Sequence, residues 1–407
     1  MKLPPVWRSR ALRAFLLAAL VSNIGNWMQI FTEQWLTLSL AGPEAARWGG
    51  RLAFASGLAT LVFIPLGGWI ADHLHRPRAL AAAQLWLMSL ALAMAVLAWK
   101  GRLGLHGLLA FALAGGVGGA LAMTLGQSLV ADLAEPGLVP AAMGLLGVQF
   151  NLSRILGPTV AAFLFPFVGP AGNFALNALT FLPLLAVVAR MRRAPPAAKE
   201  GEVLSYREGW AAIRGHRGLG MVLVLALVAG IFAWGYFALL PVYGARLLGL
   251  GERGVAGLLS MFGTGAVLGG LGVAHASRPP AQRLGRAVLA FGAAGLCLLV
   301  LAAWPDARIA PWAFLAMGLL QATFAGTLSG LVMAWAPAAL RGRINAVYLM
   351  AIIGVTPFGN LAAGEAAQAL GFHGPRWVLA GEGLVLLATA VVATVRRRRI
   401  PDGPPHP

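Results

Sequence analysis

The stretch Gly67-Gly68-Trp69-Ile70-Ala71-Asp72-His73-Leu74-His75-Arg76-Pro77-Arg78 separates two long apolar segments of the chain. Charged side chains and a proline interrupt the hydrophobic pattern here. Proline disfavours the interior of a helix because it has no N–H group and its ring clashes with the preceding turn. The stretch therefore predicts a short polar turn between two hydrophobic helices.

The composition of the whole chain explains why such a turn stands out. Of the 407 residues, 59% are hydrophobic and 11% are charged, whereas soluble globular proteins carry about 25% charged residues. The apolar excess is therefore expected to face lipid. The formal net charge of +18 does not indicate a nucleic-acid-binding protein, because the basic residues are scattered through short gaps between apolar segments.

Twelve apolar segments are each long enough to cross a bilayer, which takes about 20 helical residues. They do not alternate polar and apolar residues as the strands of a membrane barrel do. The sequence thus predicts an all-α membrane protein whose first helix is not a cleaved signal peptide. The expected spans are residues 12–40, 48–71, 79–99, 105–131, 139–168, 172–191, 219–243, 253–276, 286–304, 309–336, 344–371 and 376–395.

The distribution of Lys and Arg predicts the orientation of these spans. Of the 31 basic residues, 22 lie on one side of the membrane. They occupy the two termini, the central loop and the turns that follow spans 2, 8 and 10. Eight lie on the other side, and Arg154 lies within a span. Basic loops stay in the cytoplasm. We therefore expect a multi-pass protein of the inner or plasma membrane with both termini in the cytoplasm.

The midpoint of the chain divides the spans into two sets of six. We expect a six-helix bundle over residues 1–191, a cytoplasmic linker over 192–218, and a second bundle with a short basic tail over 219–407. Tyr206, Trp210 and Ile213 recur at helical spacing in the linker and predict a short amphipathic helix on the membrane surface. Two similar bundles around a midplane site are a common plan of transporters.

Small residues are dense in two of the expected spans. Span 4 contains the sequence GGVGG over residues 115–119, and span 8 contains GAVLG over residues 265–269. Small residues at such spacings allow membrane helices to approach closely. These stretches therefore predict close helix packing, with a sliding or gating surface as the alternative.

The opening turn also carries a family resemblance. The pattern Gly68-x-x-x-Asp72-x-x-x-Arg76-x-Arg78 resembles the signature turn between spans 2 and 3 of the major facilitator superfamily. The turn departs from the usual pattern at His73, His75 and Pro77, and span 4 lacks the Arg that many proton-coupled drug antiporters carry. Further stretches resemble the enterobactin-exporter-like and multidrug-efflux-like branch; these are residues 25–29, 35–36, 151–158, 173–181, 239–243 and 341–344.

The resemblance implies a fold of twelve transmembrane helices in two pseudo-symmetric six-helix bundles. It also implies secondary active transport by alternating access rather than an enzymatic activity. The branch favours proton-driven efflux of a small amphipathic molecule, such as a drug or a siderophore-like compound. An importer or a lipid-moving permease on the same fold is the alternative, and a non-transporting receptor or scaffold is a remote one.

The signature turn is implied to latch one conformation of the transporter. The expected opposing charges lie at the start of span 11. In the alternative interpretation the turn only sets the topology of the spans, and its acid is solvated. Arg76 and Arg78 can instead pair with Asp72 or bind anionic lipid. The candidate latch residues are Gly68, Asp72, Arg76, Arg78, Arg341 and Arg343.

Polar residues in span 1 share one helical face. Asn23, Asn26, Gln29 and Glu33 are separated by three, three and four positions. An acid at the centre of a span costs about 2.5–3.5 kcal/mol on insertion scales. The pattern thus predicts a face that lines a water-filled cavity, with Glu33 as a substrate or proton site. The alternative is a structural acid, or one near the rim of the membrane.

Arg154 lies inside span 5, one turn after Asn151. A buried Arg in a membrane normally pairs or faces a cavity. Its candidate partners are Glu33, Glu365 in span 11 and substrate anions, and a structural ion pair between helices is the alternative. Glu365 and Glu382 fall in the outer part of their spans, where a structural role or a position near the rim is expected. Asn151, Arg154 and Glu365 are nevertheless candidates for the substrate or proton pathway, with Glu365 as the second candidate acid after Glu33. Asp132 ends span 4 and is expected to pair with the central loop or the turn before span 11.

Several kinds of chemistry are not indicated. The histidines show no metal-ligand spacing, Cys297 is the single cysteine, and no phosphate-binding GxxxxGK[ST] motif is present. We therefore predict no metal site and no cofactor. The expected partners are a small-molecule substrate, protons and the lipid bilayer, without nucleic acid, and we expect the protein to be a monomer.

Overall fold

The computed structural model describes residues 9–135, 137–191, 213–274, 280–337 and 340–397. Helices account for nearly all of this part of the chain, and it contains no strand, which confirms the all-α prediction. The chain divides into two compact units. The first comprises Met1–Trp48 and Ala55–Glu200, and the second comprises Gly49–Phe54 and Gly201–Pro407. The amphipathic helix expected near Tyr206 and Trp210 lies outside the described residues, and the domain boundaries stay a prediction.

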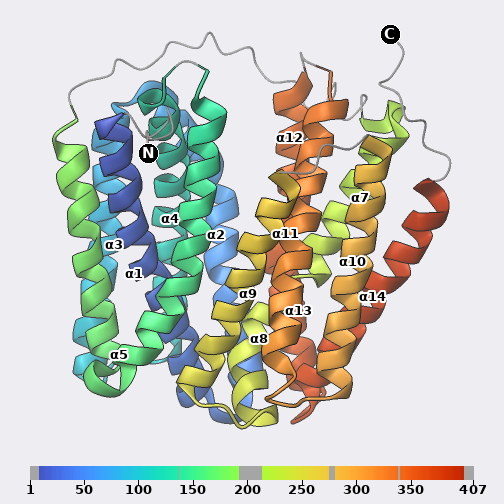
Figure 1. Ribbon diagram of the computed structural model, residues 1–407. Coiled ribbons are helices and arrows are strands. Elements are labelled where there is room, and N and C mark those ends of the chain that lie inside the picture. The colour runs from blue at the N-terminus through green and yellow to red at the C-terminus, as the bar shows by residue number, and fades with distance from the viewer. Residues whose placement is uncertain (1–8, 136, 192–212, 275–279, 338–339, 398–407) are drawn as a thin grey trace, which may run out of the picture. The chain divides into compact units, whose positions relative to one another are not determined.

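The first unit is a bundle of long helices that run side by side (Figure 1). Gly42 (φ 49°) breaks the chain between its first two helices, and Gly169 (φ 62°) interrupts its last one. Only glycine adopts such positive φ angles without strain. The elements are α1 (Arg10–Ala41), a 3₁₀ turn (Gly42–Glu44), α2 (Ala45–His73), α3 (Arg76–Trp99), α4 (Leu105–Leu133) and α5 (Val139–Ala189).

The second unit contains shorter helical pieces, because two of its spans are interrupted. One interruption contains a π-helical turn at Met350–Gly354, and a second π-helical turn, Tyr243–Leu247, ends the other span; such turns often occur at functional sites. The elements are α7 (Arg217–Phe232), α8 (Tyr236–Val242), η3 (Tyr243–Leu247), α9 (Glu252–Ala274), α10 (Pro280–Ala303), α11 (Ala310–Trp335), α12 (Arg341–Leu349), η5 (Met350–Gly354), α13 (Thr356–Ala369) and α14 (Gly374–Arg397).

Ten continuous helical segments of the described chain are long and apolar enough to cross a membrane. One of them runs from Arg10 to His73 and another from Ala141 to Ala189. At 1.5 Å per residue, each is far longer than the roughly 30 Å apolar core of a bilayer. The breaks at Gly42 and Gly169 divide each into two, which gives the twelve spans expected from the sequence.

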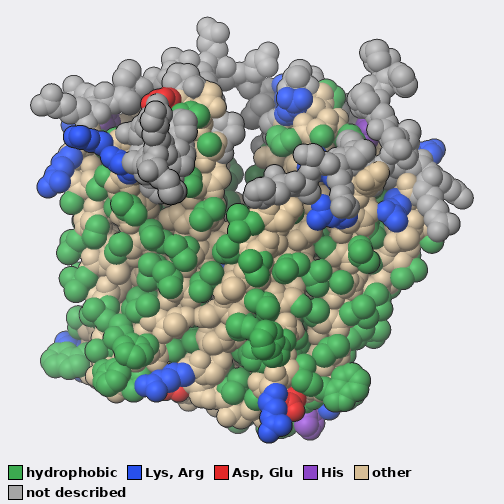
Figure 2. All heavy atoms as spheres, in the orientation of Figure 1, with side chains coloured by type: hydrophobic (Ala, Val, Ile, Leu, Met, Phe, Trp, Pro, Cys, Tyr) green, Lys and Arg blue, Asp and Glu red, His purple; other side chains and the backbone are tan. Residues whose placement is uncertain are grey.

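The outer surface of each unit is apolar. Leu17, Leu289 and Val395 are more than half exposed, as suits side chains in contact with lipid. Figure 2 shows hydrophobic side chains over the middle of the visible face and Lys or Arg towards the helix ends. Four exposed tryptophans lie near helix ends on the expected outer side, where aromatic residues anchor a protein to the membrane interface; they are Trp99, Trp304, Trp312 and Trp377.

Buried apolar side chains hold the first unit together at the end where α1 begins. Phe15 on α1, Leu80 on α3 and Leu129 on α4 are each at most 2% exposed and belong to one cluster. Leu184 and Val188 of α5 also belong to it. Each such side chain gains about 1.5–3 kcal/mol when it leaves water; inside a bilayer, close packing between helices replaces that driving force.

The expected close packing of small residues is present in both units. In the second, a Cβ atom on Gly265 or Gly269 would overlap backbone atoms of Leu315 or Leu319 on α11. In the first, Gly116 packs in the same way against the backbone of Ser56 on α2. In this structure the two stretches therefore serve to bring helices together.

Two histidines cap helices at the turns that precede α3 and α7. His75 Nδ1 accepts a hydrogen bond from Arg78 N at 3.4 Å, and His216 Nδ1 accepts one from Leu219 N at 3.1 Å. Both residues are in the extended conformation that an N-cap requires. His75 thus satisfies a backbone donor at a position where the superfamily pattern has a different residue. The ring of His216 also packs on Trp335, with centroids 5.3 Å apart.

The capping role of His216 predicts a pH-dependent stability. Burial lowers the pKa of His216 below its ordinary value of 6.5. The unfolded chain therefore binds the proton more readily, so stability falls as the pH drops below about 6.5 and through the pKa of the folded state. Protonation also removes the acceptor from Nδ1. We expect a loss of about 1 kcal/mol, the typical value of an N-cap.

Thermal unfolding of the detergent-purified protein at pH 7.5 and pH 5 tests this prediction. H216N retains a cap acceptor without a titrating group, and it should lose this component of the pH dependence while keeping its stability at pH 7.5. H216A should be less stable than H216N at pH 7.5. An unchanged pH dependence in H216N would exclude His216 as its source.

Candidate functional site

The polar face predicted for span 1 is bonded to a neighbouring helix. Gln29 Nε2 donates to Glu33 Oε1 at 2.7 Å, and Gln29 Oε1 accepts from Asn177 Nδ2 of α5 at 2.6 Å. Asn177 Oδ1 in turn accepts from the hydroxyl of Thr180 at 3.1 Å. Glu33 is only 8% exposed. The structure therefore brings Gln29 and Glu33 together in a network that also contains Asn177.

A second buried contact lies next to this network on α1. Asn173 Nδ2 donates to Thr32 Oγ1 and to the carbonyl oxygen of Ala161, both at 3.1 Å. Asn173 is fully buried. Its two bonds connect α1 with both halves of α5, on either side of the break at Gly169. The sequence did not indicate that Asn173 and Asn177, four residues apart, bond to α1, although two amides at helical spacing in an apolar span are a usable signal for such contacts.

Two of the predicted polar residues of span 1 make no such contact. Asn23 and Asn26 are half-buried, and no hydrogen bond joins either side chain to another described residue. Both lie on the same helical face as Gln29. The face thus contains one bonded end around Glu33 and one end with available amide groups.

The carboxyl group of Glu33 has no cation beside it within the described part of the chain. Its hydrogen bond comes from the amide of Gln29, whereas the sequence suggested Arg154 as a partner. A neutral amide donor can remain bonded whether the carboxyl group is charged or protonated. The site can therefore bind and release a proton without breaking an ion pair.

Arg154 lies on an aromatic ring of α1. Its Cζ atom is 5.3 Å from the ring centroid of Trp27, which also contacts Phe150 edge-on at 5.9 Å. A cation over a tryptophan face gains about 0.5–2 kcal/mol. Asn151 Nδ2 donates to the carbonyl oxygen of Gly147, within its own helix. The contact of Arg154 with Trp27 connects α5 to α1 on the N-terminal side of Glu33.

The signature turn is held by an ion pair inside the first unit. Arg76 Nη1 lies 2.6 Å from both carboxylate oxygens of Asp132 at the end of α4. Arg76 Nε donates to the carbonyl oxygen of Ala71 at 2.7 Å, and Arg76 Nη2 is 3.9 Å from Asp72. Within the first unit Asp132 therefore pairs with Arg76, whereas the central loop over residues 192–212 lies outside the described residues and its pairing with Asp132 stays a prediction.

The other residues of the turn are more exposed. The side chain of Asp72 is 56% exposed, and Arg78 is exposed. A Cβ atom on Gly68 would meet nothing within 4 Å, whereas one on Gly67 would overlap Thr124 of α4. Close helix packing in this turn thus depends on Gly67, although the resemblance pointed to Gly68.

The remaining predicted residues lie in the second unit. Arg341 Nε donates to the carbonyl oxygen of Ala336 at 3.3 Å, and Arg343 lies in the first turn of α12. Glu365 Oε1 accepts from Arg51 Nε at 2.9 Å, and both side chains are about 40% exposed. Segment 49–54 belongs to this same unit.

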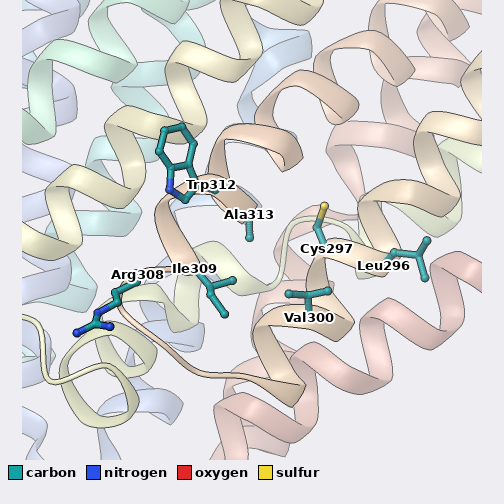
Figure 3. A pocket seen from close by; sticks show the side chains of 7 residues that line it. All are labelled: Leu296, Cys297, Val300, Arg308, Ile309, Trp312 and Ala313. Atoms are coloured by element: carbon teal, nitrogen blue, oxygen red, sulfur yellow. The ribbon is translucent and has the colours of Figure 1, made fainter.

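A pocket in the second unit is separate from all of these residues. It has a volume of about 330 Å³ and lies between the end of α10 and the start of α11, as Figure 3 shows. Its walls are almost entirely apolar, with Arg308 and Trp312 among the residues that line it. No group of three His, Cys, Asp or Glu side chains in the described residues could hold a metal ion.

Comparison with known proteins places these features in a family. A family model described as "Transmembrane secretion effector" matches residues 3–403. The multidrug efflux pump Tap of Mycolicibacterium fortuitum is 25% identical over 390 residues, which is 93% of each chain.

Solved structures of transporters share the fold. The nucleoside transporter NupG aligns with a TM-score of 0.74 and 12% identity, over 96% of this chain and 100% of that one. A bacterial homologue of the human lysosomal transporter Spinster, in an inward-facing and unoccupied conformation, aligns with a TM-score of 0.72 and 16% identity. That alignment covers 97% of this chain and 98% of the homologue.

The hydrogen-bond network around Gln29 predicts that replacing this residue lowers the stability of the protein measurably. Replacing Gln29 with Leu leaves the carboxyl group of Glu33 and the amide of Asn177 without their partner, which costs about 1–3 kcal/mol for each buried group. N23L, on the same helical face, removes a half-buried amide that bonds no other described side chain. Thermal unfolding in detergent should show a much larger loss for Q29L than for N23L, and equal losses would contradict the network.

The ion pair of Arg76 with Asp132 predicts a difference in stability between two variants of the signature turn. Hydrogen bonds to charged groups contribute about 1.5–3 kcal/mol, and the side chain of Arg76 is only 11% exposed. R76A should therefore destabilise the protein by that amount, whereas R78A, at an exposed position in the same turn, should cost under about 0.5 kcal/mol. A double-mutant cycle with D132N measures the pair itself, and additive losses would show that the two side chains do not interact.

Proposed function

Because the chain belongs to the transmembrane secretion effector family of the major facilitator superfamily, we propose that this transporter exports a small amphipathic molecule in exchange for protons. Membership is established by the family model, which spans nearly the whole chain. It makes the protein a multi-pass membrane transporter rather than an enzyme. Export is supported by the family description and by the similarity to a multidrug efflux pump.

The observation that carries the proton-coupled mechanism is the burial of Glu33 in a network of amides. A charged carboxylate inside a membrane is costly unless a cation compensates it, and Gln29 supplies only a neutral donor. Binding of a cationic substrate nearby would favour the charged form, and a proton would favour substrate release. Competition of this kind couples the two movements in opposite directions.

Other predicted residues are proposed to form the substrate path. Asn23 and Asn26 supply amide groups on the face of α1 that continues from Gln29. Arg154 and Asn151 extend this face on α5, where the ring of Trp27 also suits a flat apolar substrate. Glu365 is proposed as a second acid of the pathway, used when its bond to Arg51 opens.

The signature turn is proposed to act as a conformational latch. Asp72 and Arg78 are exposed and therefore accessible to opposing charges, while Arg76 stays bound to Asp132. Arg341 and Arg343 are the proposed opposing cations for Asp72. Gly68 allows another backbone to approach, since nothing lies within 4 Å of its Cβ position.

The basic residues favour an inner or plasma membrane location with both termini in the cytoplasm, and we propose that the monomer is the working unit. An importer or a lipid-moving permease is the alternative function. Transport measurements on the protein in reconstituted vesicles with an imposed pH gradient distinguish these functions. The compounds to assay are a panel of amphipathic dyes and a fluorescent phospholipid.

We expect the pH gradient to drive a dye against its own concentration gradient, in the direction opposite to the flow of protons. E33Q should reduce this movement at least about tenfold, which corresponds to ~1.4 kcal/mol in the barrier, because an amide does not take up and release a proton as a carboxyl group does. D306N, at an exposed acid in the second unit, is the matched control and should transport normally. Movement that does not depend on the gradient would exclude proton coupling, and E33Q at the normal rate would remove Glu33 from the mechanism.

A further inference from the structure

The second unit contains a helix break within the membrane. α7 ends at Phe232 and α8 begins at Tyr236, so three residues between them are not helical. Gln321 of α11 donates from Nε2 to the carbonyl oxygen of Ala233 at 2.9 Å. The hydroxyl of Tyr236 then donates to Gln321 Oε1 at 3.4 Å. Interrupted membrane helices are tolerated where side chains satisfy the freed backbone groups.

A buried acid lies against this break. Glu382 of α14 is 5% exposed. A Cβ atom on Gly235 would overlap Glu382 Oε1, and it would lie 3.0 Å from the Cβ atom of Ala363 on α13. The carboxyl group is therefore enclosed by α14, α13 and the break. Its other oxygen, Oε2, is buried and has no hydrogen-bond partner in the described part of the chain.

The charged and titratable groups on the surrounding helices are engaged elsewhere. Arg376, six residues earlier on α14, binds the carbonyl oxygens of Ala302 and Ala303. Glu365 on α13 binds Arg51, and Tyr243 donates to the carbonyl oxygen of Leu301. Arg217 on α7 and the remaining basic residues of α10 and α14 lie near helix ends, and Cys297 of α10 lines the apolar pocket.

We infer that Glu382 is a proton-binding site of the second unit, located at the break between α7 and α8. Among the described residues no cation forms an ion pair with it, and an uncompensated charge at such a buried place is costly. A metal ion is a poor occupant because it needs several oxygen ligands, and no group of three His, Cys, Asp or Glu side chains in the described residues could hold one. A proton requires only the carboxyl group itself.

The site is suited to connect proton release with a change of helix geometry. Gly235 and Glu382 are in close contact, so a charge on the carboxyl group would act directly on the backbone of the break. Trp234 directly precedes Gly235 within the break. A role of Glu382 in transport rests on the proposed proton-coupled function, whereas the proton site itself stands on the geometry around Glu382.

Infrared spectroscopy of the full-length protein in lipid tests the site directly. In an E33Q background, which removes the other buried acid of the expected spans, we expect the carbonyl-stretch band of a protonated carboxylic acid to be present at neutral pH and to disappear at high pH. E382Q should abolish this band. D306N removes an exposed acid instead and should leave the band unchanged. A band that persists in E382Q, or its absence from the E33Q protein, would overturn the inference.

A second variant guards against loss of folding in E382Q. G235A adds a methyl group where Glu382 Oε1 lies and should shift the band, and an unshifted band would contradict the contact. Transport assays on the protein with Glu33 intact, reconstituted in the same lipid, keep the two proposals distinct. If the pH gradient drives no transport but the Glu382 band titrates, proton coupling fails and the site stands; if transport is driven but the band is missing, the site fails alone.

Discussion

The backbone of a membrane protein must satisfy its polar groups without water, and this requirement shapes several irregular points of the described chain. In lipid, each unsatisfied N–H or C=O group costs several kcal/mol. The structure meets this requirement with long helices. At several places where a helix ends or breaks, a polar side chain bonds a backbone carbonyl group. Gln321 binds the carbonyl of Ala233 at the α7–α8 break. Arg76 and Arg341 do the same for the last turns of α2 and α11.

The same requirement separates the polar residues that helix packing explains from the two acids that we propose as proton sites. Gln321 and Asn173 are buried and bonded to backbone groups, so helix packing alone explains their presence. Glu33 and Glu382 are different, since neither carboxyl group supports a backbone carbonyl. One has a neutral amide donor, and the other has an oxygen without a hydrogen bond in the described residues. Evolution tolerates such costly groups in membranes mainly where they act.

The sequence was sufficient to predict the fold because the fold depends on local properties. Span lengths follow from apolar segments, and the turns follow from charges and prolines. Partners across the bundle were harder to predict, because they depend on how each helix is rotated about its axis. Gln29 and Asn177 are 148 residues apart. Arg76 and Asp132 are 56 apart, and the turn sequence offered Asp72 as a nearer partner.

The position of Arg76 changes how the signature turn can work. Its guanidinium group is fixed between Asp132 and the end of α2, so it holds three helices of the first unit together. An arginine in this role cannot leave without breaking two short bonds to one carboxylate. A latch that opens in every transport cycle is therefore better built from exposed groups. Asp72 and Arg78 meet that condition, while Arg76 provides the rigid support that keeps them in place.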